Sequence, residues 1–327
     1  MRHLLTTALA LLLCAGCTTL PTPTTGTPTT STPTPAAPSA SPSQTPSGSP
    51  TAVAWKDIPV APKKTSAFDV ILSDPKLLVL DADEPTGPYM FAVFGNQVLF
   101  DDPGDEDVLT YTNGRRTGGA AIDNPDDYVE DLLAHGSELY VLQGDGDTAT
   151  NRKVHVYHRN ASGKRLTPVR VLPGELVAGN AQAWMHFSGP NLVGEAWGDE
   201  PVLLDGAGPL TEPTFGQTAT VFTVQLPGGQ SLRIHTRYGP SSIDLVMLDD
   251  DYAYYLAEDY DEDSDSGAMA TYVYRMALTA AGSDATYTLA GSPGYEPSRL
   301  VQVVDGQVYQ LRATNKAVQV LRLHPNP

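Results

Sequence analysis

The chain has 327 residues, with 20 Lys and Arg against 38 Asp and Glu, so its formal net charge is −18. This excess of acid argues against binding to nucleic acid or to a bare anionic membrane, because the protein repels phosphate groups at long range. The two cysteines, Cys14 and Cys17, are three residues apart, and so close a pair excludes a disulfide-stapled scaffold.

The first element in chain order is an apolar run near the N-terminus. One positive charge, Arg2, precedes ten uncharged residues from Leu4 to Leu13, six of which are leucine. A helix that crosses about 30 Å of hydrocarbon needs roughly 20 apolar residues, so this run is too short to span a bilayer. A basic start followed by a short apolar run is typical of a secretory signal.

Small residues follow, in the order Cys14-Ala15-Gly16-Cys17. This segment resembles the lipobox of bacterial lipoproteins, except that Cys14 stands where the family prefers leucine. The resemblance implies cleavage after Gly16, with residues 1–16 as the signal peptide, and lipid attachment to Cys17. It further implies an extracytoplasmic protein that acyl chains hold to the bacterial cell membrane, each buried methylene contributing about 0.8 kcal/mol. An ordinary secretory signal with an incidental cysteine, or an uncleaved signal anchor, are the alternatives.

The segment from Thr18 to Ala52 changes composition abruptly. Its 35 residues include 12 Thr, 9 Pro and 6 Ser and no charged residue. Such a segment has almost nothing to bury and cannot offset the entropy of ordering, so residues 17–52 are predicted to be a lipidated, disordered stalk. Proline at this density favours an extended chain. Glycosylation of the stalk is left open.

Residues 53–327 are predicted to fold as one all-β domain. All 38 acidic residues and 19 of the 20 basic ones lie here, which leaves a net charge of −19. Short runs rich in Val, Leu and Tyr alternate with turn residues, as in Tyr272 to Leu278, and this pattern is typical of strands. The best helix candidate runs from Pro125 to His135, because Val129, Leu132 and Leu133 have helical spacing between Asn124 and Gly136.

A weak internal repeat runs through this domain. A turn with Gly, Asn or Asp precedes a short apolar strand five times, and the first apolar residues of these strands are Val98, Leu139, Leu192, Ala253 and Val308. Their spacings are long enough for a four-stranded unit plus a loop, and propeller blades recur at about 40–50 residues. The longest interval, from Leu192 to Ala253, has room for a further, poorly matched unit.

The pattern resembles the repeats of extracytoplasmic bacterial β-propellers, although no WD or kelch motif is present. The resemblance implies a propeller-like fold of about six blades. A β-sandwich or two smaller all-β domains are the alternatives.

The sharpest local feature is an acidic stretch from Asp249 to Asp265, with nine acids in 17 residues and no base. Asp261, Asp263 and Asp265 alternate within it, and alternate side chains of a loop can converge on a cation such as Ca²⁺. Calcium is therefore the one cofactor that the sequence suggests. The stretch lacks the Gly and Glu that an EF-hand loop requires, and solvated surface loops are the alternative interpretation.

A basic segment lies between Arg152 and Arg170, with six bases and no acid. It could attract an anionic envelope polymer or an acidic protein partner. The alternative is a charged outer hairpin beside an acidic neighbour.

Patterns for catalysis are missing from the sequence. It has no metalloprotease motif, P-loop or dinucleotide fingerprint, and no thiol after Cys17. We therefore assign no catalytic residue. Trp55, Trp184 and Trp197 are candidates for stacking on sugars, with core packing as the plainer interpretation.

These observations lead to one expected function and one rival. We expect a membrane-anchored surface lipoprotein whose β-domain binds an envelope polymer, a glycan or a protein. The rival is an extracytoplasmic carbohydrate-active enzyme with carboxylates in a propeller funnel. Two convergent carboxylates with raised pKa in a central funnel would favour the enzyme.

Overall fold

The computed structural model of the chain comprises two compact units, Met1–Thr51 and Ala52–Pro327. The structure describes residues 55–59, 62, 64–80, 85–86, 88, 90–101, 107–122, 127–145, 152–158, 165–176, 183–196, 200–207, 214–218, 221–225, 231–235, 240–260, 269–291 and 300–327. All of them belong to the second unit. Cys17, Asp261, Asp263 and Asp265 lie outside the described residues.

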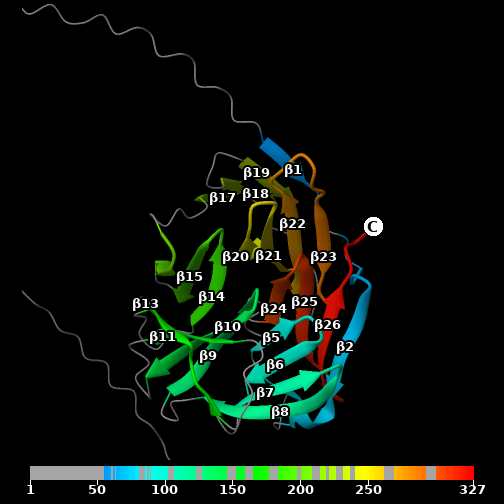
Figure 1. Cartoon of the computed structure of the whole chain (residues 1–327). Coiled ribbons are helices and arrows are strands. Elements are labelled where there is room, and N and C mark those ends of the chain that lie inside the picture. The colour runs from blue at the N-terminus through cyan, green and yellow to red at the C-terminus, as the bar shows by residue number, and fades with distance from the viewer. Residues whose placement is uncertain are drawn as a thin grey trace, which may run out of the picture. The chain divides into compact units, whose positions relative to one another are not determined.

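The described residues are almost entirely β-structure (Figure 1), which confirms the all-β prediction. The helical element whose bounds the structure describes is a 3-10 turn, η1 (Pro75–Leu77). No helix in these ranges is long and apolar enough to cross a bilayer.

Five sheets follow one another along the chain, and each is named here by its order. The first sheet contains β5 (Phe91–Phe94), β6 (Gln97–Asp101), β7 (Asp107–Thr112) and β8 (Arg115–Ile122), with β12 (Arg165–Leu166) at its edge. The second contains β9 (Asp127–His135), β10 (Glu138–Asp145), β11 (Arg152–His158) and β13 (Arg170–Leu176). The third contains β14 (Ala183–Ser188), β15 (Asn191–Ala196) and β16 (Val202–Asp205).

The fourth sheet contains β20 (Pro240–Leu248), β21 (Tyr252–Tyr260), β22 (Met269–Ala277) and β23 (Ala285–Thr288). The fifth contains β24 (Val301–Val304), β25 (Gln307–Ala313), β26 (Val318–Leu323) and, from the other end of the domain, β2 (Phe68–Asp74). A further sheet, called the added sheet, contains β17 (Thr214–Thr218), β18 (Val221–Gln225), β19 (Ser231–His235) and β1 (Trp55–Ile58). Strands β3 (Val79–Leu80) and β4 (Pro85–Thr86) form a small separate pair.

The first strands of the five sheets form a closed inner ring. Strand β5 contacts β9, β9 contacts β14, β14 contacts β20, β20 contacts β24, and β24 contacts β5. Strands β14 and β20 also pair directly, in parallel, at Phe187 with Met247 and Ser188 with Leu248. Sheets that radiate from such a ring are the arrangement of a β-propeller.

The two ends of the domain close the ring by pairing with each other. Strand β2 runs antiparallel to β26, the last strand of the chain, from Phe68 with Leu323 to Asp74 with Val318. Just before β2, the Ser66 hydroxyl accepts a hydrogen bond from the Thr288 amide at 2.9 Å and donates one to Asn326 Oδ1 at 2.9 Å. Because a sheet edge is thereby covered at the junction, closure protects backbone groups that would otherwise be unpaired.

The sequence repeat corresponds to the second strand of each ring sheet. Val98, Leu139, Leu192, Ala253 and Val308 lie in β6, β10, β15, β21 and β25. The turns that precede four of these strands need positive φ, as at Gly136 (57°) and Gly189 (59°), a backbone region that glycine enters without strain. The long interval between the third and fourth repeats contains β17–β19 of the added sheet. Because β14 pairs with β20, the third and fourth sheets are two halves of one seven-stranded sheet, so the described residues form five ring units with the added sheet beside them.

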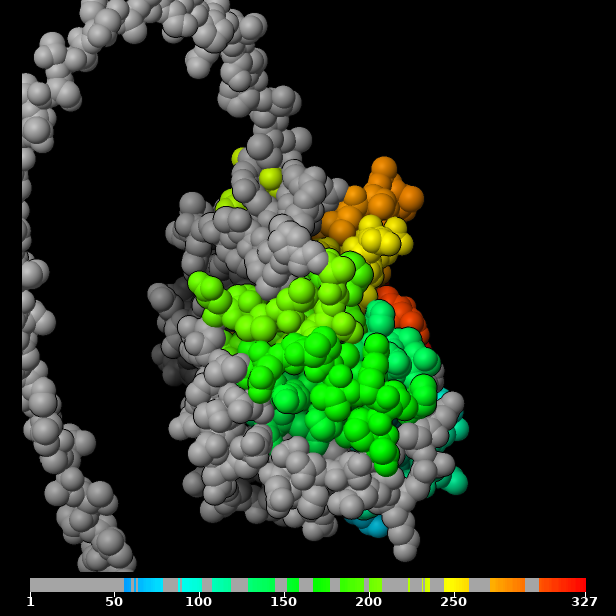
Figure 2. Space-filling model, turned by 60° about the vertical axis from the view of Figure 1, so that its left-hand side comes forward, coloured from blue at the N-terminus to red at the C-terminus, as the bar shows by residue number. Residues whose placement is uncertain are grey.

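Hydrophobic layers lie between neighbouring sheets. Separate clusters join the first sheet to the second, the second to the third, the fourth to the fifth and the fifth to the first. The added sheet packs through Ile58 and Ile234 on the fourth sheet. Figure 2 shows the green segments of the second and third sheets side by side on one face of the molecule. There the backbone of β16 comes so close to Gly174 that a Cβ would lie 2.4 Å from Leu204 Cα.

The helix predicted from Pro125 to His135 is wrong, because the described part of this segment is strand β9. The pairing of β9 with β10 shifts between Leu142 and Gln143, which leaves Glu130 as an extra residue in a β-bulge. Val129 and Leu132 therefore belong to one hydrophobic cluster although they are three positions apart. A bulge in an inner strand, buried on both faces, thus imitates helical spacing.

Candidate functional site

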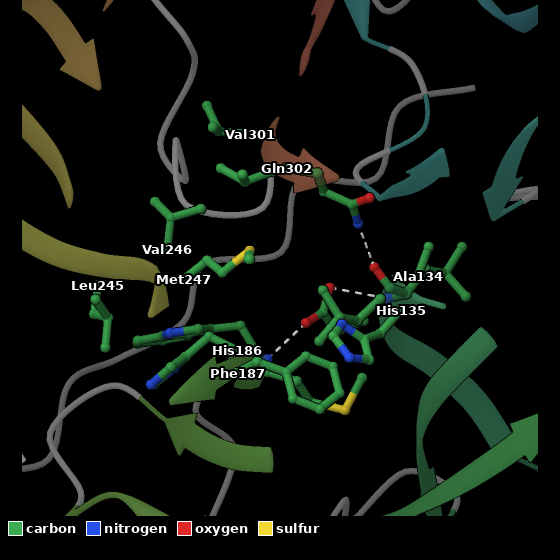
Figure 3. A pocket seen from close by; sticks show the side chains of 15 residues that line it. Ala134, His135, His186, Phe187, Leu245, Val246, Met247, Val301 and Gln302 are labelled. Carbon is green, nitrogen blue, oxygen red and sulfur yellow. Dashed lines mark hydrogen bonds between the residues drawn. The ribbon is translucent and has the colours of Figure 1, made fainter. Parts of the chain in front are cut away.

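A small cavity opens among four inner strands of the ring (Figure 3), and its volume open to the centres of water molecules is about 40 Å³. It has room for about three waters. Its walls are Asp131–His135 of β9, residues 184–187 of β14, residues 245–247 of β20 and residues 301–303 of β24. Because these segments lie in the last part of β9, β14 and β20, the cavity is nearer the hairpin turns that begin the second strands.

Aromatic rings lie beside the cavity. The rings of His135 and Phe187 are 4.2 Å apart between centroids and 31° from parallel, and Figure 3 shows them next to each other. Tyr140 packs edge-on against Phe187, with 5.4 Å between centroids. His135 is exposed and Phe187 half-buried. These rings offer flat, partly apolar surface at the side of a polar cavity.

Three residues in the cavity wall carry buried polar atoms without a hydrogen-bond partner. They are Trp184 Nε1, both ring nitrogens of His186, and Gln302 Oε1. The side chains of His186 and Gln302 are 1% and 6% exposed. A buried polar group without a partner costs about 1–3 kcal/mol. These atoms gather around one cavity, so a polar molecule bound there would pair with them and remove this cost.

Burial keeps His186 uncharged. It lowers the pKa of this histidine to about 4, so the ring is neutral at pH 7. The Nδ1 atom lies 3.5 Å from Glu195 Oε1, but with a neutral ring this contact is not an ion pair. A neutral imidazole offers one donor and one acceptor, so His186 can serve a ligand group of either kind.

Asp131 is the one carboxylate among the described wall residues, and it holds the backbone. Its Oδ2 accepts a hydrogen bond from the Met185 amide at 2.6 Å, and its Oδ1 accepts one from the Leu132 amide at 2.9 Å. The bulge at Glu130 re-aims the chain at this point. Asp131 thereby joins β9 to β14 across the ring.

Gln302 joins three inner strands. Its Nε2 donates to the carbonyl oxygen of Leu132 in β9 at 2.6 Å and also to that of Phe91 in β5. Since Gln302 itself lies in β24, one amide group ties β24 to two neighbours while its oxygen remains without a partner.

Trp184 was among the aromatic candidates from the sequence, but His186 and Gln302 were missed. Trp184 is half-buried in the cavity wall rather than in a hydrophobic cluster. Single polar residues interrupt otherwise apolar inner strands at Trp184-Met185-His186-Phe187 and at Val301-Gln302-Val303. That interruption was the available signal, because a polar residue in a strand buried on both faces needs a specific partner.

The structure divides the predicted acidic stretch between two ends of the fourth sheet. Asp249 to Asp251 form the turn between β20 and β21, where Asp249 Oδ1 accepts from the amides of Asp251 and Tyr252 at 2.8 and 2.6 Å. Glu258 lies near the other end of β21, just before the undescribed segment that contains the calcium candidates. Within the described ranges, no three His, Cys, Asp or Glu side chains gather as a metal site.

The described bases of the basic segment divide between two sheets: Arg152 and Lys153 lie in β11 and Arg170 in β13 of the second sheet, whereas Arg165 lies in β12 at the edge of the first. Arg159 and Lys164 lie outside the described residues. The ends of the segment are not free cations. Arg152 is 2% exposed and its Nε donates to Glu130 Oε1 at 2.5 Å. The residue opposite Arg152 in β10 is Gly144, which has no side chain to obstruct the path to Glu130. Arg170 pairs with Glu138 at 2.7 Å. At Arg152 and Arg170, the structure therefore supports the alternative interpretation, in which the bases of the segment pair with acidic neighbours.

No protein-family model matches this sequence, and no curated protein does. Among solved structures, a streptogramin B lyase is 10% identical over 80% of this chain and 98% of its own, with a TM-score of 0.34. A glucose dehydrogenase-like oxidoreductase of Thermus thermophilus is 11% identical over 79% of this chain and 100% of its own, with a TM-score of 0.37. The WD40 propeller domain of Doa1 is 11% identical over 78% and 97%, with a TM-score of 0.38.

At such identities and TM-scores these likenesses carry nothing about activity or ligand. The propeller-like architecture rests instead on the topology of this chain, in which five radial sheets surround an inner ring that β2 and β26 close.

Proposed function

We propose that this protein is a surface lipoprotein whose propeller-like domain binds a neutral, hydroxyl-rich ligand, such as a glycan, at the central cavity. The observation that carries this proposal is the set of unpartnered buried polar atoms on Trp184, His186 and Gln302 around one cavity. Together they offer donors and acceptors without a formal charge. Sugar hydroxyls both donate and accept, so they suit such a wall.

The size of the cavity lets only part of a sugar ligand enter it. About 40 Å³ receives a substituent such as a hydroxymethyl or acetamido group, but not a whole sugar ring. The remainder of the ligand would then lie against His135 and Phe187, whose rings match the apolar face of a sugar.

The proposal can be tested with the purified full chain in detergent. The probes are the trimer of N-acetylglucosamine, a glucose trimer and an acidic oligosaccharide, and binding is measured by ligand-observed NMR. We expect a neutral trimer to bind, and Trp184→Phe to weaken it about fivefold, because it removes the N–H donor and keeps an aromatic ring. His158→Ala is the matched control, since His158 is exposed on β11 outside the cavity wall. Binding by none of the neutral probes would refute the ligand class.

The enzymatic alternative would require its carboxylates at the cavity. A carboxyl with raised pKa does occur at Asp244, near Glu258, but neither residue lies in the cavity wall. This placement supports binding over hydrolysis. Release of reducing ends from the same trimers during incubation with the full chain would favour the enzyme instead.

The anchor is part of the same proposal and rests on the lipobox-like residues that end at Cys17. A metabolic label with a palmitate analogue should mark the wild-type chain and the control variant Cys14→Ala. It should be absent from Cys17→Ala, and label retained on that variant would exclude lipidation at this position.

A further inference from the structure

A second group of oxygen-bearing side chains lies on the fourth sheet, outside the cavity wall. Asp244 of β20, Glu258 of β21 and Thr271 of β22 are on three successive strands. Glu258 is directly opposite Thr271, and Asp244 is opposite Leu256, two residues from Glu258. Because cross-strand partners and residues two apart share a face, all three side chains project from the same side of the sheet.

This side of the sheet faces the fifth sheet. Leu256 and Val273, which share the face, pack with Val301 and Val308 in one hydrophobic cluster. The two carboxyl groups therefore stand at the border of an apolar interface. Burial and the nearby charge of Glu258 raise the pKa of Asp244 to about 6. Two such carboxylates repel each other in a partly dehydrated setting unless a proton or a cation stands between them.

An independent observation indicates a ligand. Thr271 is 1% exposed, and its hydroxyl has no hydrogen-bond partner. A buried threonine hydroxyl without a partner is unusual, and this one lies beside the carboxylate of Glu258 rather than in a purely apolar layer. Its oxygen can accept a cation's positive charge in the way that carboxylate oxygens do.

The distribution of charge around the three residues fits a cation. Among the described residues on this face of β20–β23, the other ionisable groups are Tyr252, Tyr254, Arg275 and Tyr287. Arg275 is four residues from Thr271 along β22, which corresponds to about 13 Å. The facing strand β24 of the fifth sheet, Val301–Val304, carries no charged residue.

From these observations we propose that Asp244, Glu258 and Thr271 bind a hard divalent cation such as Ca²⁺, with water completing the coordination. Two carboxylates and a hydroxyl are the oxygen ligands that Ca²⁺ selects. The ion would hold β20, β21 and β22 together where the sheet borders the fifth sheet. With so few protein charges, the affinity expected is that of extracellular modules, with Kd about 10⁻⁴–10⁻³ M.

The test is the thermal midpoint of the full chain in detergent at pH 7, with chelator and with about 5 mM Ca²⁺. Calcium should raise the midpoint by about 3 °C in the wild type. The rise should disappear in Asp244→Asn, a variant that keeps the shape of the side chain. It should persist in Asp250→Asn, which makes the same charge change at an exposed turn of the same sheet.

A second variant and a second condition make the test specific. Thr271→Val should weaken calcium binding about fivefold while it preserves the packing volume. At pH 5 a proton competes for Asp244, so the apparent Kd should be about tenfold higher than at pH 7.

Three results would overturn the site. They are no calcium effect on the wild type, an equal effect on Asp244→Asn, or an effect that survives Asp244→Asn but vanishes when Asp261, Asp263 and Asp265 are all changed to Asn. Since the readout is melting rather than ligand binding at the cavity, a failure here leaves the proposed glycan site untouched.

Discussion

Replacing Gln302 with methionine should weaken the inner ring of sheets. Methionine has a similar length but cannot donate a hydrogen bond. The change removes both bonds from Nε2, to the carbonyl oxygens of Leu132 and Phe91, and leaves these two oxygens in a buried setting. The strands β24, β9 and β5 lose a side chain that joins all three.

The size of the effect follows from the two lost bonds. Each hydrogen bond contributes about 1 kcal/mol net to the free energy of unfolding. A buried acceptor that loses its partner adds part of a desolvation penalty of about 1–3 kcal/mol. The wild-type Gln302 Oε1 is already without a partner, and its removal returns part of the loss. We therefore expect Gln302→Met to lower the free energy of unfolding by about 2–4 kcal/mol, a large share of the roughly 5–15 kcal/mol typical of a domain.

The assay is urea unfolding of the full chain, followed by tryptophan fluorescence and by circular dichroism. Gln302→Glu should be more harmful than Gln302→Met, because its carboxylate would face two carbonyl oxygens. Gln307→Met is the matched control, since Gln307 is exposed at the start of β25 and should change stability by less than about 0.5 kcal/mol. Equal midpoints for Gln302→Met and Gln307→Met would refute the role of Gln302 in joining the strands.

Three further predictions concern titration and packing. The pKa of His186 is lowered to about 4, so the unfolded chain takes up a proton that the folded chain refuses, and stability should fall as the pH drops from 6.5 to 4. In His186→Gln this loss, about 3 kcal/mol, should be absent from denaturation curves measured across that range. The pH dependence that Asp244 gives to stability has the opposite sign. Because its pKa is raised to about 6, its stabilising contribution is largest below pH 4 and disappears as the pH rises through 6. Without added calcium, Asp244→Asn should therefore be more stable than the wild type at pH 7, by up to about 3 kcal/mol, and a less stable variant would contradict the assignment. Gly174→Ala would place a Cβ 2.4 Å from Leu204 Cα and should lower the thermal midpoint by several degrees, whereas Gly118→Ala, with no atom within 4 Å, should not.

Much of the fold could be predicted from local pattern. Short apolar runs between turn residues indicated strands, and the five aligned turns correspond to the five ring sheets. The turns were recognisable because residues such as Gly136 and Gly189 must adopt positive φ wherever the chain reverses so tightly. The long interval in the repeat contains three strands of the added sheet, β17–β19, whose fourth strand, β1, comes from the start of the domain.

Other features depended on pairing and could not be read locally. The segment before His135 looked helical because a bulge at Glu130 changes the strand period from two to three at that point. A bulge exists only in relation to the neighbouring strand, so no single segment reveals it. The burial of Arg152 likewise depends on Gly144 in the partner strand, which leaves a path to Glu130.

The sequence by itself predicted an acidic all-β domain built from repeats, and the described residues confirm its all-β class. Those are properties of composition and of neighbours along the chain, where hydrophobic period and turn chemistry act directly. Only the tertiary structure decided which residues meet at the ring axis. His186 and Gln302 are far apart along the chain, and they share a cavity because ring closure brings β14 and β24 together. The ring closes through the pairing of β2 with β26, at the two ends of the domain. For that reason the candidate site became visible only in three dimensions.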